Sequence, residues 1–531
     1  MSDKNDIMQI AEHSAHGGYY LFVGNTLSTG ILAISSIIIA RLLGPADYGL
    51  FSLSIVVPSI LIGLIDFGIP SAITRFSAKF RAEEKNPEVG NIIKAGLMFE
   101  ITVGIVASAF CFLFSDFLAT YIINRPQASF YVKVVSFLIL FQTLFNAINS
   151  ALIGLDRMKN NALIMIIRAF TKILLSPLLI ILGFGIFGAL LSHISCYIVA
   201  VAAGMASLSL MFPRNHSDYG SHSEILKTML KYGAPLYMSG LLGLFILQYQ
   251  TIIIAFFASN IEVGNYQVAT LFSTAIAILV YPITALFPAF SKLDTQNGQL
   301  SQFFKRSVKY TALLLVPASV AIAVLSKDLV YAFFGSEYNL APTFAAFYIL
   351  LNLYAGLGSA VFQYLFSGIG RTDVVLKASL VNMLVFIPSA PLLTQLYGII
   401  GLITSLFISN FCSLLYLLLT AVKKINVSLD ASSSAKIYLA STISALPLSI
   451  FLAYSQFGSI LNLIVGGVIF CIAYLTLLPI IGIINFTDIE IFRLISQKIR
   501  SLRIILKFLL LYETIILGFT QKLSRRKQAP S

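Results

Sequence analysis

Four charged side chains stand inside long apolar stretches of this 531-residue sequence: Asp66, Glu100, Arg168 and Lys172. Arg168 and Lys172 are four residues apart, so on a helix they share one face. Arginine presents a planar fork of N–H donors that matches phosphate, and lysine adds a compact positive charge. The two cations could therefore bind an anionic group. The two carboxylates could hold these cations when the site is empty, or bind a coupling cation.

A structural interpretation of the same residues stays open at this point, because Glu100 could pair with Lys172 or Arg168 and pin helix packing. His193 is a further ionisable residue in an apolar stretch, and a histidine there is more often packed than part of a proton relay. The second half of the chain offers only uncharged polar groups at comparable depth. The remaining candidates for a polar cavity are His193, Gln248, Gln250, Gln363 and Asn382.

The composition explains why buried charges matter in this chain. Hydrophobic residues make up 58%, charged residues 11%, and the mean hydropathy is +0.90. A soluble globular chain averages roughly 45–50% apolar and about 25% charged residues. These values exclude a soluble enzyme, a disordered chain and a secreted disulfide scaffold.

Apolar runs of the roughly 20 residues that span a bilayer recur along the chain. We therefore predict an all-α polytopic membrane protein with about 14 transmembrane helices. The predicted runs start near Gly18, Leu50, Asn91, Phe130, Ala162, Ile186, Tyr232, Gly264, Val308, Thr343, Val374, Gly398, Ile437 and Ser459.

The distribution of cations predicts the orientation of these helices. The formal net charge is +13, from 35 Lys and Arg against 22 Asp and Glu. When each cation is assigned to the nearer end of its predicted helix, 31 of the 35 fall on the side of the N-terminus. The other side collects Arg41, Arg125, Lys133 and Lys327. The positive-inside rule then places both termini in the cytoplasm of a multi-pass plasma-membrane protein, with no need for a nucleic-acid partner.

The sequence leaves no loop long enough for a soluble catalytic or nucleotide-binding domain. The longest loop, 212–231, is about twenty residues, and the chain lacks a G-x-x-x-x-G-K-[ST] phosphate-binding loop and an H-E-x-x-H metal motif. We expect no catalytic residue, no metal site and no cofactor.

An internal repeat divides most of the chain into halves. The tetrapeptide Ile-Ile-Ile-Ala occupies 37–40 and 252–255, and a glycine follows nine residues later, as Gly49 and Gly264, at an offset of 215. Two further matches have nearly the same offset: Arg157 with Arg371 at 214, and Asp116 with Asp328 at 212. Both copies begin with a run that leads from inside to outside, so they are parallel repeats of the kind found in transporters.

The repeat predicts two parallel six-helix lobes and two extra helices. The tail interleaves apolar and basic residues, which is typical of a helix that lies on the anionic inner leaflet. The predicted organisation is a cytoplasmic N-terminus (1–17), a first six-helix lobe (18–211), a cytoplasmic linker (212–231), a second six-helix lobe (232–422), helices 13 and 14 (423–486) and a basic amphipathic cytoplasmic tail (487–531).

Two stretches near the N-terminus resemble a known family. Residues 38–51 read I-I-A-R-L-L-G-P-A-D-Y-G-L-F and residues 64–76 read L-I-D-F-G-I-P-S-A-I-T-R-F. Both resemble the oligosaccharide flippases, the polysaccharide-exporter branch of the multidrug/oligosaccharidyl-lipid/polysaccharide exporter superfamily. The segments 330–338 and 366–372 are similar to later loops of that family, so the resemblance covers about residues 17–484.

The resemblance implies a two-lobe helical fold with a central cavity that works by alternating access. Its substrate would be a glycan linked to polyprenyl phosphate or pyrophosphate, moved from the cytoplasmic to the outer leaflet, with glycan assembly enzymes as further partners. Cavity arginines of the family engage the pyrophosphate, and Arg41 and Arg75 lie on the matching signature. Arg168 and Lys172 suit the same role by depth alone.

Three alternatives stay open on the sequence. A cation-coupled multidrug or toxin exporter of the same superfamily could use Asp66 with Glu100, but Arg168 and Lys172 would repel cationic drugs. A lipid II-type flippase is a second transporter. A membrane-embedded glycosyltransferase or polymerase is more distant, because it would need acidic catalytic groups on an outer loop longer than the roughly fifteen residues present here.

Overall fold

The computed structural model describes residues 2–211, 222–280, 286, 290, 298–486, 488–490, 493, 512–514 and 516–518, and side chains from Tyr19 onward. All regular elements in this part of the chain are helical, which confirms the predicted all-α class. Residues 212–221 of the predicted linker and most of the predicted tail lie outside the described residues.

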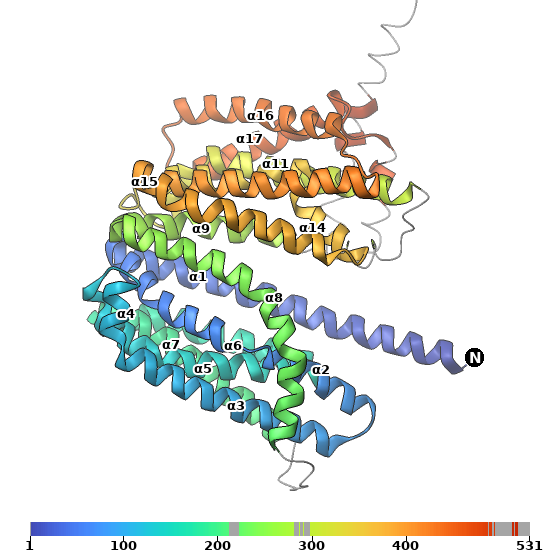
Figure 1. The fold of residues 1–531 in the computed structure, drawn as a ribbon. Coiled ribbons are helices and arrows are strands. Elements are labelled where there is room, and N and C mark those ends of the chain that lie inside the picture. The colour runs from blue at the N-terminus through green and yellow to red at the C-terminus, as the bar shows by residue number, and fades with distance from the viewer. Residues whose placement is uncertain are drawn as a thin grey trace, which may run out of the picture. The chain divides into compact units, whose positions relative to one another are not determined.

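The chain forms two compact units (Figure 1). Unit 1 comprises Met1–Val268, Glu337–Asn339 and Met383–Ser405, and so contains the predicted first lobe together with the start of the second. Its helical elements are α1 (Ser2–Ile65), α2 (Ile69–Ala82), α3 (Asn86–Leu113), α4 (Ser115–Tyr121), η1 (Pro126–Ala128), α5 (Ser129–Gly154), α6 (Met158–Leu179), η2 (Ile180–Phe184), α7 (Gly185–Ser209), α8 (His222–Phe257) and the first part of α9 (Asn260–Val280).

Unit 2 comprises Ala269–Ser336, Leu340–Asn382 and Leu406–Ser531. The helix α15 contributes its middle segment to unit 1 and its two ends to unit 2. The elements that belong wholly or partly to unit 2 are the end of α9, α11 (Gln299–Val324), α12 (Ser326–Phe333), α13 (Ala341–Ile349), η4 (Leu350–Leu357), α14 (Ser359–Gly368), α15 (Thr372–Ile425), α16 (Ala431–Tyr454) and α17 (Ser459–Ile480).

Glycines break the longest apolar helices into shorter ones. Eight helical segments of the described chain are long and apolar enough to cross a membrane, and three of them are 47, 52 and 54 residues long. Each of these three contains a glycine with positive φ: Gly44 at 74°, Gly183 at 92° and Gly398 at 60°. Because an L residue with a side chain is strained there, glycine permits the break. Each long segment therefore joins two of the apolar runs that the sequence predicts.

A further break occurs at Gly358, whose φ is 87°. The helical pair Ala341–Leu357 and Ser359–Gly368 is bent there by 48°, and together the two pieces have the length and apolarity of one span. This span is thus assembled from two helical pieces that meet at a glycine.

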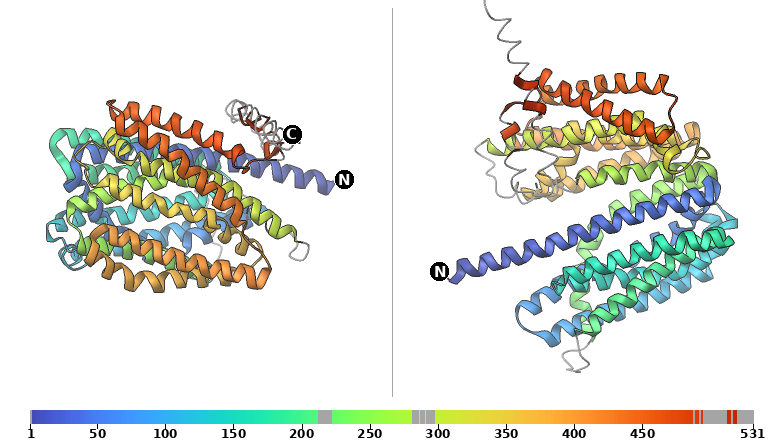
Figure 2. Two further views of the ribbon diagram at one scale, coloured as in Figure 1. Left: turned by 90° about the horizontal axis from the view of Figure 1, so that it is seen from above. Right: turned by 180° about the vertical axis from the view of Figure 1, so that it is seen from behind.

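Small residues set how closely the helices of unit 1 pack. The helices α1, α5, α6 and α7 lie side by side, and α3 packs on α5 (Figures 1 and 2). A Cβ added at Gly204 of α7 would lie 2.5 Å from the Ile148 side chain of α5, and one at Gly154 would lie 2.8 Å from the Thr74 carbonyl oxygen of α2. Without apolar solvation to drive association, close backbone approach supplies the contact energy inside a membrane.

Unit 2 has its own hydrophobic core. Phenylalanines of α11 and α14 pack together inside it, with the tilted Phe304 and Phe362 rings 4.9 Å apart between centroids. A second core cluster joins α11, α16 and α17 and takes in four residues from beyond α17: Ile483, Ile484, Ile489 and Leu517. The Tyr512 hydroxyl lies 2.7 Å from that of Thr476 on α17. The described part of the tail thus packs on unit 2, and its placement on a leaflet stays a prediction.

Asp488 anchors the segment after α17 to α11. Its carboxylate accepts from Lys309 Nζ and from the Tyr310 hydroxyl, each at 2.7 Å, and from the Asn485 backbone N–H at 3.0 Å. Burial would raise the pKa of Asp488, but the bonds from Lys309, Asn485 and Tyr310 outweigh it and lower that pKa below its usual value. This ion pair is mostly buried, at 15% and 11% side-chain exposure.

We expect Asp488→Ala to lower the thermal unfolding midpoint in detergent by the equivalent of about 2–4 kcal/mol, because it strands the Lys309 charge in a mostly buried site. Since the folded pKa of Asp488 is lowered, its contribution is present above the unfolded pKa near 4 and is lost as pH falls through the folded value. The matched control is Asp373→Ala, which removes an exposed ion pair with Arg371 and should change little. Equal midpoints for the two variants would contradict the anchor.

Candidate functional site

The helix α6 presents its two mid-span cations to α5 and α7 within unit 1. Arg168 Nη1 donates to the Tyr197 hydroxyl of α7 at 3.1 Å. The Arg168 guanidinium carbon lies 4.7 Å from the Phe145 ring centroid of α5 and 5.1 Å from that of Tyr197. Aromatic faces attract a cation without neutralising its charge, so these contacts orient the guanidinium and leave it positive.

Lys172 lies one turn further along α6 and is 8% exposed. Its charged neighbour is Arg168, and both cations act electrostatically on His193 of α7. The His193 ring packs edge-on against Phe51 of α1 and against Tyr197. Four helices, α1, α5, α6 and α7, therefore build one basic cluster, defined here as Arg168, Lys172 and His193.

The basic cluster lacks a negative counterpart. No ion pair within 4.0 Å joins Arg168 or Lys172 to a carboxylate in the described part of the chain. Two buried nitrogens of the cluster, Arg168 Nε and His193 Nδ1, also find no hydrogen-bond partner among the residues that the structure describes. Because a buried cation and an unpaired polar atom are both costly, the arrangement is suited to an anion that would supply charge and acceptors together.

The carboxylates lie elsewhere in unit 1. Glu100 of α3 is 1% exposed, and its Oε1 atom has no hydrogen-bond partner in the described ranges of the chain. The charged group that acts on it is Asp66, whose Oδ1 atom accepts from the Gly68 backbone N–H at 2.9 Å. The structure thus does not form the ion pair between Glu100 and Arg168 or Lys172 that the sequence allows. The cations and the carboxylates belong to separate groups.

The two arginines of the sequence signature are carried by α1 and α2, whereas the two cations of the basic cluster are on α6. Arg75 is exposed on α2, and its guanidinium carbon stands 4.1 Å from the Tyr232 ring centroid of α8. Arg41 is exposed on α1 near the break at Gly44. Within the described residues, the aromatic contacts of Arg75 are with Phe76 and Tyr232, which are not part of the basic cluster.

The uncharged candidates divide between the units. Gln250 of α8 is 9% exposed and donates to the Tyr266 hydroxyl, whereas Gln248 is half-buried on the same helix. Asn382 donates to Asn410 Oδ1 at 3.2 Å within unit 2, and Gln363 is exposed on α14. Among all sequence candidates, the structure brings together Arg168, Lys172 and His193.

Two residues of this site, Tyr197 and Phe145, are not among the candidates predicted from the sequence. Tyr197 follows His193 by four residues, so the two share a face of α7, and this spacing is a usable signal. Phe145 is one of 42 phenylalanines and carries no signal that marks it as a partner of Arg168.

The fold, its apolar helices and the polar groups inside them define a multi-pass membrane protein. The family model described as "Polysaccharide biosynthesis protein" matches residues 38–342. Because this match covers more than half of the chain, the protein belongs to that family, and the resemblance seen in the sequence is confirmed.

Curated relatives carry related names. The "Lipopolysaccharide biosynthesis protein WzxC" of Escherichia coli (strain K12) is 21% identical over 407 residues, 74% of this chain and 78% of the relative. The "Probable low-salt glycan biosynthesis flippase Agl15" of Haloferax volcanii is 23% identical over 474 residues, 86% and 89% of the two chains. The "Succinoglycan biosynthesis transport protein ExoT" of Rhizobium meliloti is 22% identical, and the match spans 62% of its length.

Solved structures share the fold. A "Lipid II flippase MurJ, inward closed conformation" superimposes with a TM-score of 0.71 at 16% identity and covers 87% of this chain and 98% of that one. An inward-facing multidrug resistance MATE family transporter has a TM-score of 0.61 at 17% identity, over 76% and 98% of the chains. Both likenesses concern the fold.

We expect Lys172→Met to raise the thermal midpoint of the ligand-free protein in detergent, by the equivalent of about 1 kcal/mol or more. The change removes a buried ammonium that pairs with no carboxylate in the described part of the chain, and it keeps an apolar side chain of similar length. Lys159→Met is the control, because Lys159 is exposed at the start of the same helix. A lower midpoint for Lys172→Met would mean that the charge stabilises the fold and would contradict a site built for an anion.

Proposed function

We propose that this protein is a flippase that moves lipid-linked glycan precursors across the plasma membrane by alternating access. The basic cluster carries the proposal, because among the described residues no carboxylate pairs with its two cations, in a chain of the polysaccharide biosynthesis family. A phosphate or pyrophosphate linkage between lipid and glycan would supply the missing charge. The names of the relatives WzxC, ExoT and Agl15 agree with a role in glycan export.

The chemistry of the substrate explains why such a site lies at membrane depth. A sugar headgroup that entered hydrocarbon would lose its hydrogen bonds to water at a cost of several kcal/mol for each unsatisfied group. A polar path through the protein replaces these partners while the polyprenyl tail stays in the bilayer. Arg168 would grip two phosphate oxygens through its fork, and Lys172 would add a second positive charge.

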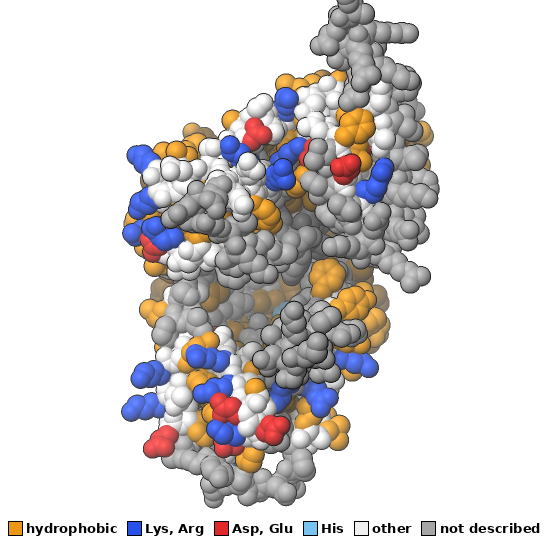
Figure 3. All heavy atoms as spheres, turned by 90° about the vertical axis from the view of Figure 1, so that its right-hand side faces the viewer, with side chains coloured by type: hydrophobic (Ala, Val, Ile, Leu, Met, Phe, Trp, Pro, Cys, Tyr) orange, Lys and Arg blue, Asp and Glu red, His pale blue; other side chains and the backbone are white. Residues whose placement is uncertain are grey.

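We also propose the finer topology. The described helices are compatible with fourteen spans if the breaks at Gly44, Gly183 and Gly398 each separate two spans, the pair bent at Gly358 is one span, and α8 and α9 each cross once. An even number keeps both termini in the cytoplasm. Lys and Arg side chains gather on the face shown in Figure 3, as expected at a cytoplasmic end. On unit 1 the exposed cations of the α2–α3 turn are Lys79, Arg81 and Lys85.

The remaining sequence candidates fit into the same proposal. Arg41 and Arg75 would meet the headgroup at stages of the cycle other than the one observed, since both are exposed. Asp66 and Glu100 would respond to a coupling cation or proton, and Gln248, Gln250, Gln363 and Asn382 would offer hydrogen bonds to sugar hydroxyls. Glycan assembly enzymes would deliver the substrate on the cytoplasmic side.

One observation favours a second candidate, a cation-coupled multidrug exporter. The fold resembles a MATE family transporter, and the neighbouring carboxylates Asp66 and Glu100 could bind a coupling cation. The basic cluster disfavours it, because Arg168 and Lys172 would repel the cationic drugs that such exporters carry. We therefore place the flippase first.

The topology can be tested by labelling from outside the cell. In a variant without the four native cysteines, Phe457→Cys should react with a membrane-impermeant maleimide in intact cells, whereas Lys85→Cys should react only after the membrane is opened. Both positions are exposed, so accessibility of the side chain is matched. The reverse pattern would invert the proposed orientation.

The substrate site can be tested by export. We expect Arg168→Ala and Lys172→Ala each to reduce appearance of the glycan outside the cell by roughly 10- to 100-fold, since each removes charge-assisted bonds to the linkage. Lipid-linked glycan should accumulate inside, and membrane insertion should be unchanged. Lys159→Ala, on an exposed turn of the same helix, should export normally. Normal export by the double variant would rule out the proposed role.

A further inference from the structure

The two copies of the internal repeat meet each other inside unit 1. The repeated tetrapeptide ends at Ala40 in α1 and at Ala255 in α8, and both alanines are buried. We can therefore compare the contacts that each copy makes at positions that match at the offset of 215. The residues of this contact all belong to unit 1, including the short segment Glu337–Asn339.

The matched glycines make reciprocal backbone contacts. A Cβ added at Gly49 would lie 2.9 Å from the Asn260 carbonyl carbon and 3.0 Å from the Gly264 nitrogen. A Cβ added at Gly264 would lie 2.8 Å from the Pro45 carbonyl carbon. Because Pro45 and Asn260 also match at the offset of 215, each copy touches the other at the same place. The start of α9 and the part of α1 that follows its break thus cross with no room for a side chain at either glycine.

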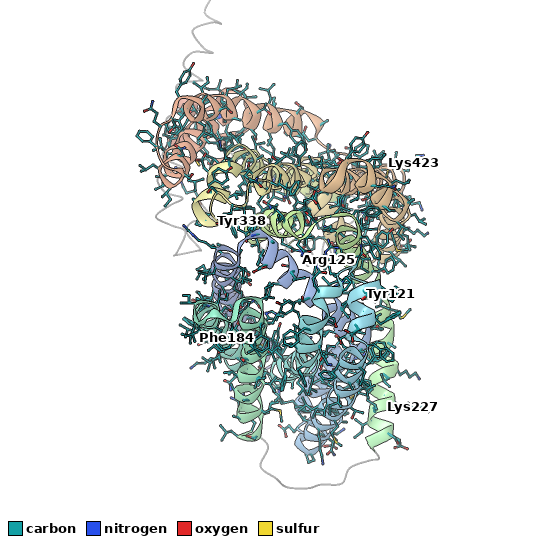
Figure 4. All side chains as sticks on the ribbon, turned by 90° about the vertical axis from the view of Figure 1, so that its left-hand side faces the viewer. Tyr121, Arg125, Phe184, Lys227, Tyr338 and Lys423 are labelled. Atoms are coloured by element: carbon teal, nitrogen blue, oxygen red, sulfur yellow. The ribbon has the colours of Figure 1, made fainter. Side chains whose placement is uncertain are left out.

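One side chain from each half donates a hydrogen bond to a backbone carbonyl of the other half, and the two carbonyls occupy matching positions of the repeat. Arg125, in the loop between α4 and α5, donates from Nη1 to the Ala255 carbonyl at 3.0 Å. Tyr338, in the loop between α12 and α13, donates from its hydroxyl to the Ala40 carbonyl at 2.6 Å. Figure 4 labels both side chains. The two loops are equivalent, since α4 and α12 are short helices that begin at Ser115 and Ser326 after matching long ones.

Arg125 also secures the turn between α8 and α9. Its Nε donates to Asn260 Oδ1 at 2.7 Å, and its Nη2 donates to the Ala258 carbonyl. Carbonyls at the end of a helix have no partner within that helix, and a cation there complements the helix dipole. The partners of Arg125 are neutral, so its bonds can be exchanged for bonds to water without leaving a buried charge behind.

From these contacts we propose an outer latch, defined as Arg125, Tyr338, Gly49 and Gly264, that closes one end of the transport path and opens once in each cycle. The proposed topology places this end outside, because Arg125 is one of the few outward cations. The glycines bring the helices into contact, and the two donors hold them with bonds that water can replace. The proposal rests on the proposed transport function, but the closure itself can be measured without any glycan.

The first experiment measures opening by labelling. Ala258→Cys, in a variant without the four native cysteines, places a thiol at a position that is 5% exposed in the closed latch. We expect an impermeant maleimide added outside intact cells to react about tenfold faster when Arg125→Gln is added, and about fivefold faster with Tyr338→Phe. If Arg125→Gln fails to fold, Tyr338→Phe still tests the latch, because it removes a single hydroxyl and preserves the fold.

Two controls match these changes. Lys327→Gln removes another outward cation that takes no part in the latch and should leave the labelling rate unchanged. Gly264→Ala should accelerate labelling, whereas Gly30→Ala should not, because a Cβ at Gly30 meets nothing within 4 Å. Unchanged labelling in both Arg125→Gln and Tyr338→Phe would overturn the latch.

The second experiment locks the latch. In the same cysteine-free variant, Arg125→Cys with Asn260→Cys places two thiols where a bonded pair now stands, within reach of a short bis-methanethiosulfonate. We expect the cross-link to stop glycan export and a reductant to restore it. Full export by a completely cross-linked protein would refute the gate. Faster labelling in the first experiment, together with no glycan export by the native protein, would instead support the latch and reject the proposed substrate.

Discussion

Hydrocarbon offers no hydrogen-bond partner to a polar group, and the structure of this protein follows from that constraint. Helices satisfy the backbone internally, so the described elements are all helical. The helix does not satisfy the charged side chains in the same way, so each of them needs a partner from another helix or from a ligand. Arg168 finds two aromatic faces and a hydroxyl, but neither it nor Lys172 finds a carboxylate within the described residues. This missing negative partner makes the basic cluster a candidate site for an anion.

Glycine serves two distinct purposes in this fold. At Gly44, Gly183 and Gly398 a positive φ lets a long apolar helix break, which divides segments longer than a bilayer into pieces that can cross it. At Gly49 and Gly264 the lack of a side chain lets two helix backbones touch. The first use shapes single helices, and the second determines which helices meet. A transporter needs both, since its helices must cross the membrane and also separate.

The candidate site could be predicted in part. The spacing of Arg168 and Lys172 places them on one face of a helix, because helical periodicity depends on sequence alone. Their partners could not be predicted, because Phe145, Tyr197 and His193 come from helices whose neighbours are chosen by packing. The sequence equally allowed Glu100 as a partner, but in the structure Glu100 forms no ion pair with Arg168 or Lys172 among the described residues, and the charge that acts on it is that of Asp66. Charge and depth can be read along the chain, but pairing depends on which helices adjoin.

The sequence by itself determined the helical class, the family and the match between two halves, because each depends on local composition or on residue spacing. Only the tertiary structure decided that the matched positions touch. Ala40 and Ala255 are 215 residues apart, and no periodicity predicts that Tyr338 reaches one while Arg125 reaches the other. Contacts between distant segments depend on how helices pack, and in a membrane that packing is set by the shape of helix surfaces rather than by their hydrophobicity.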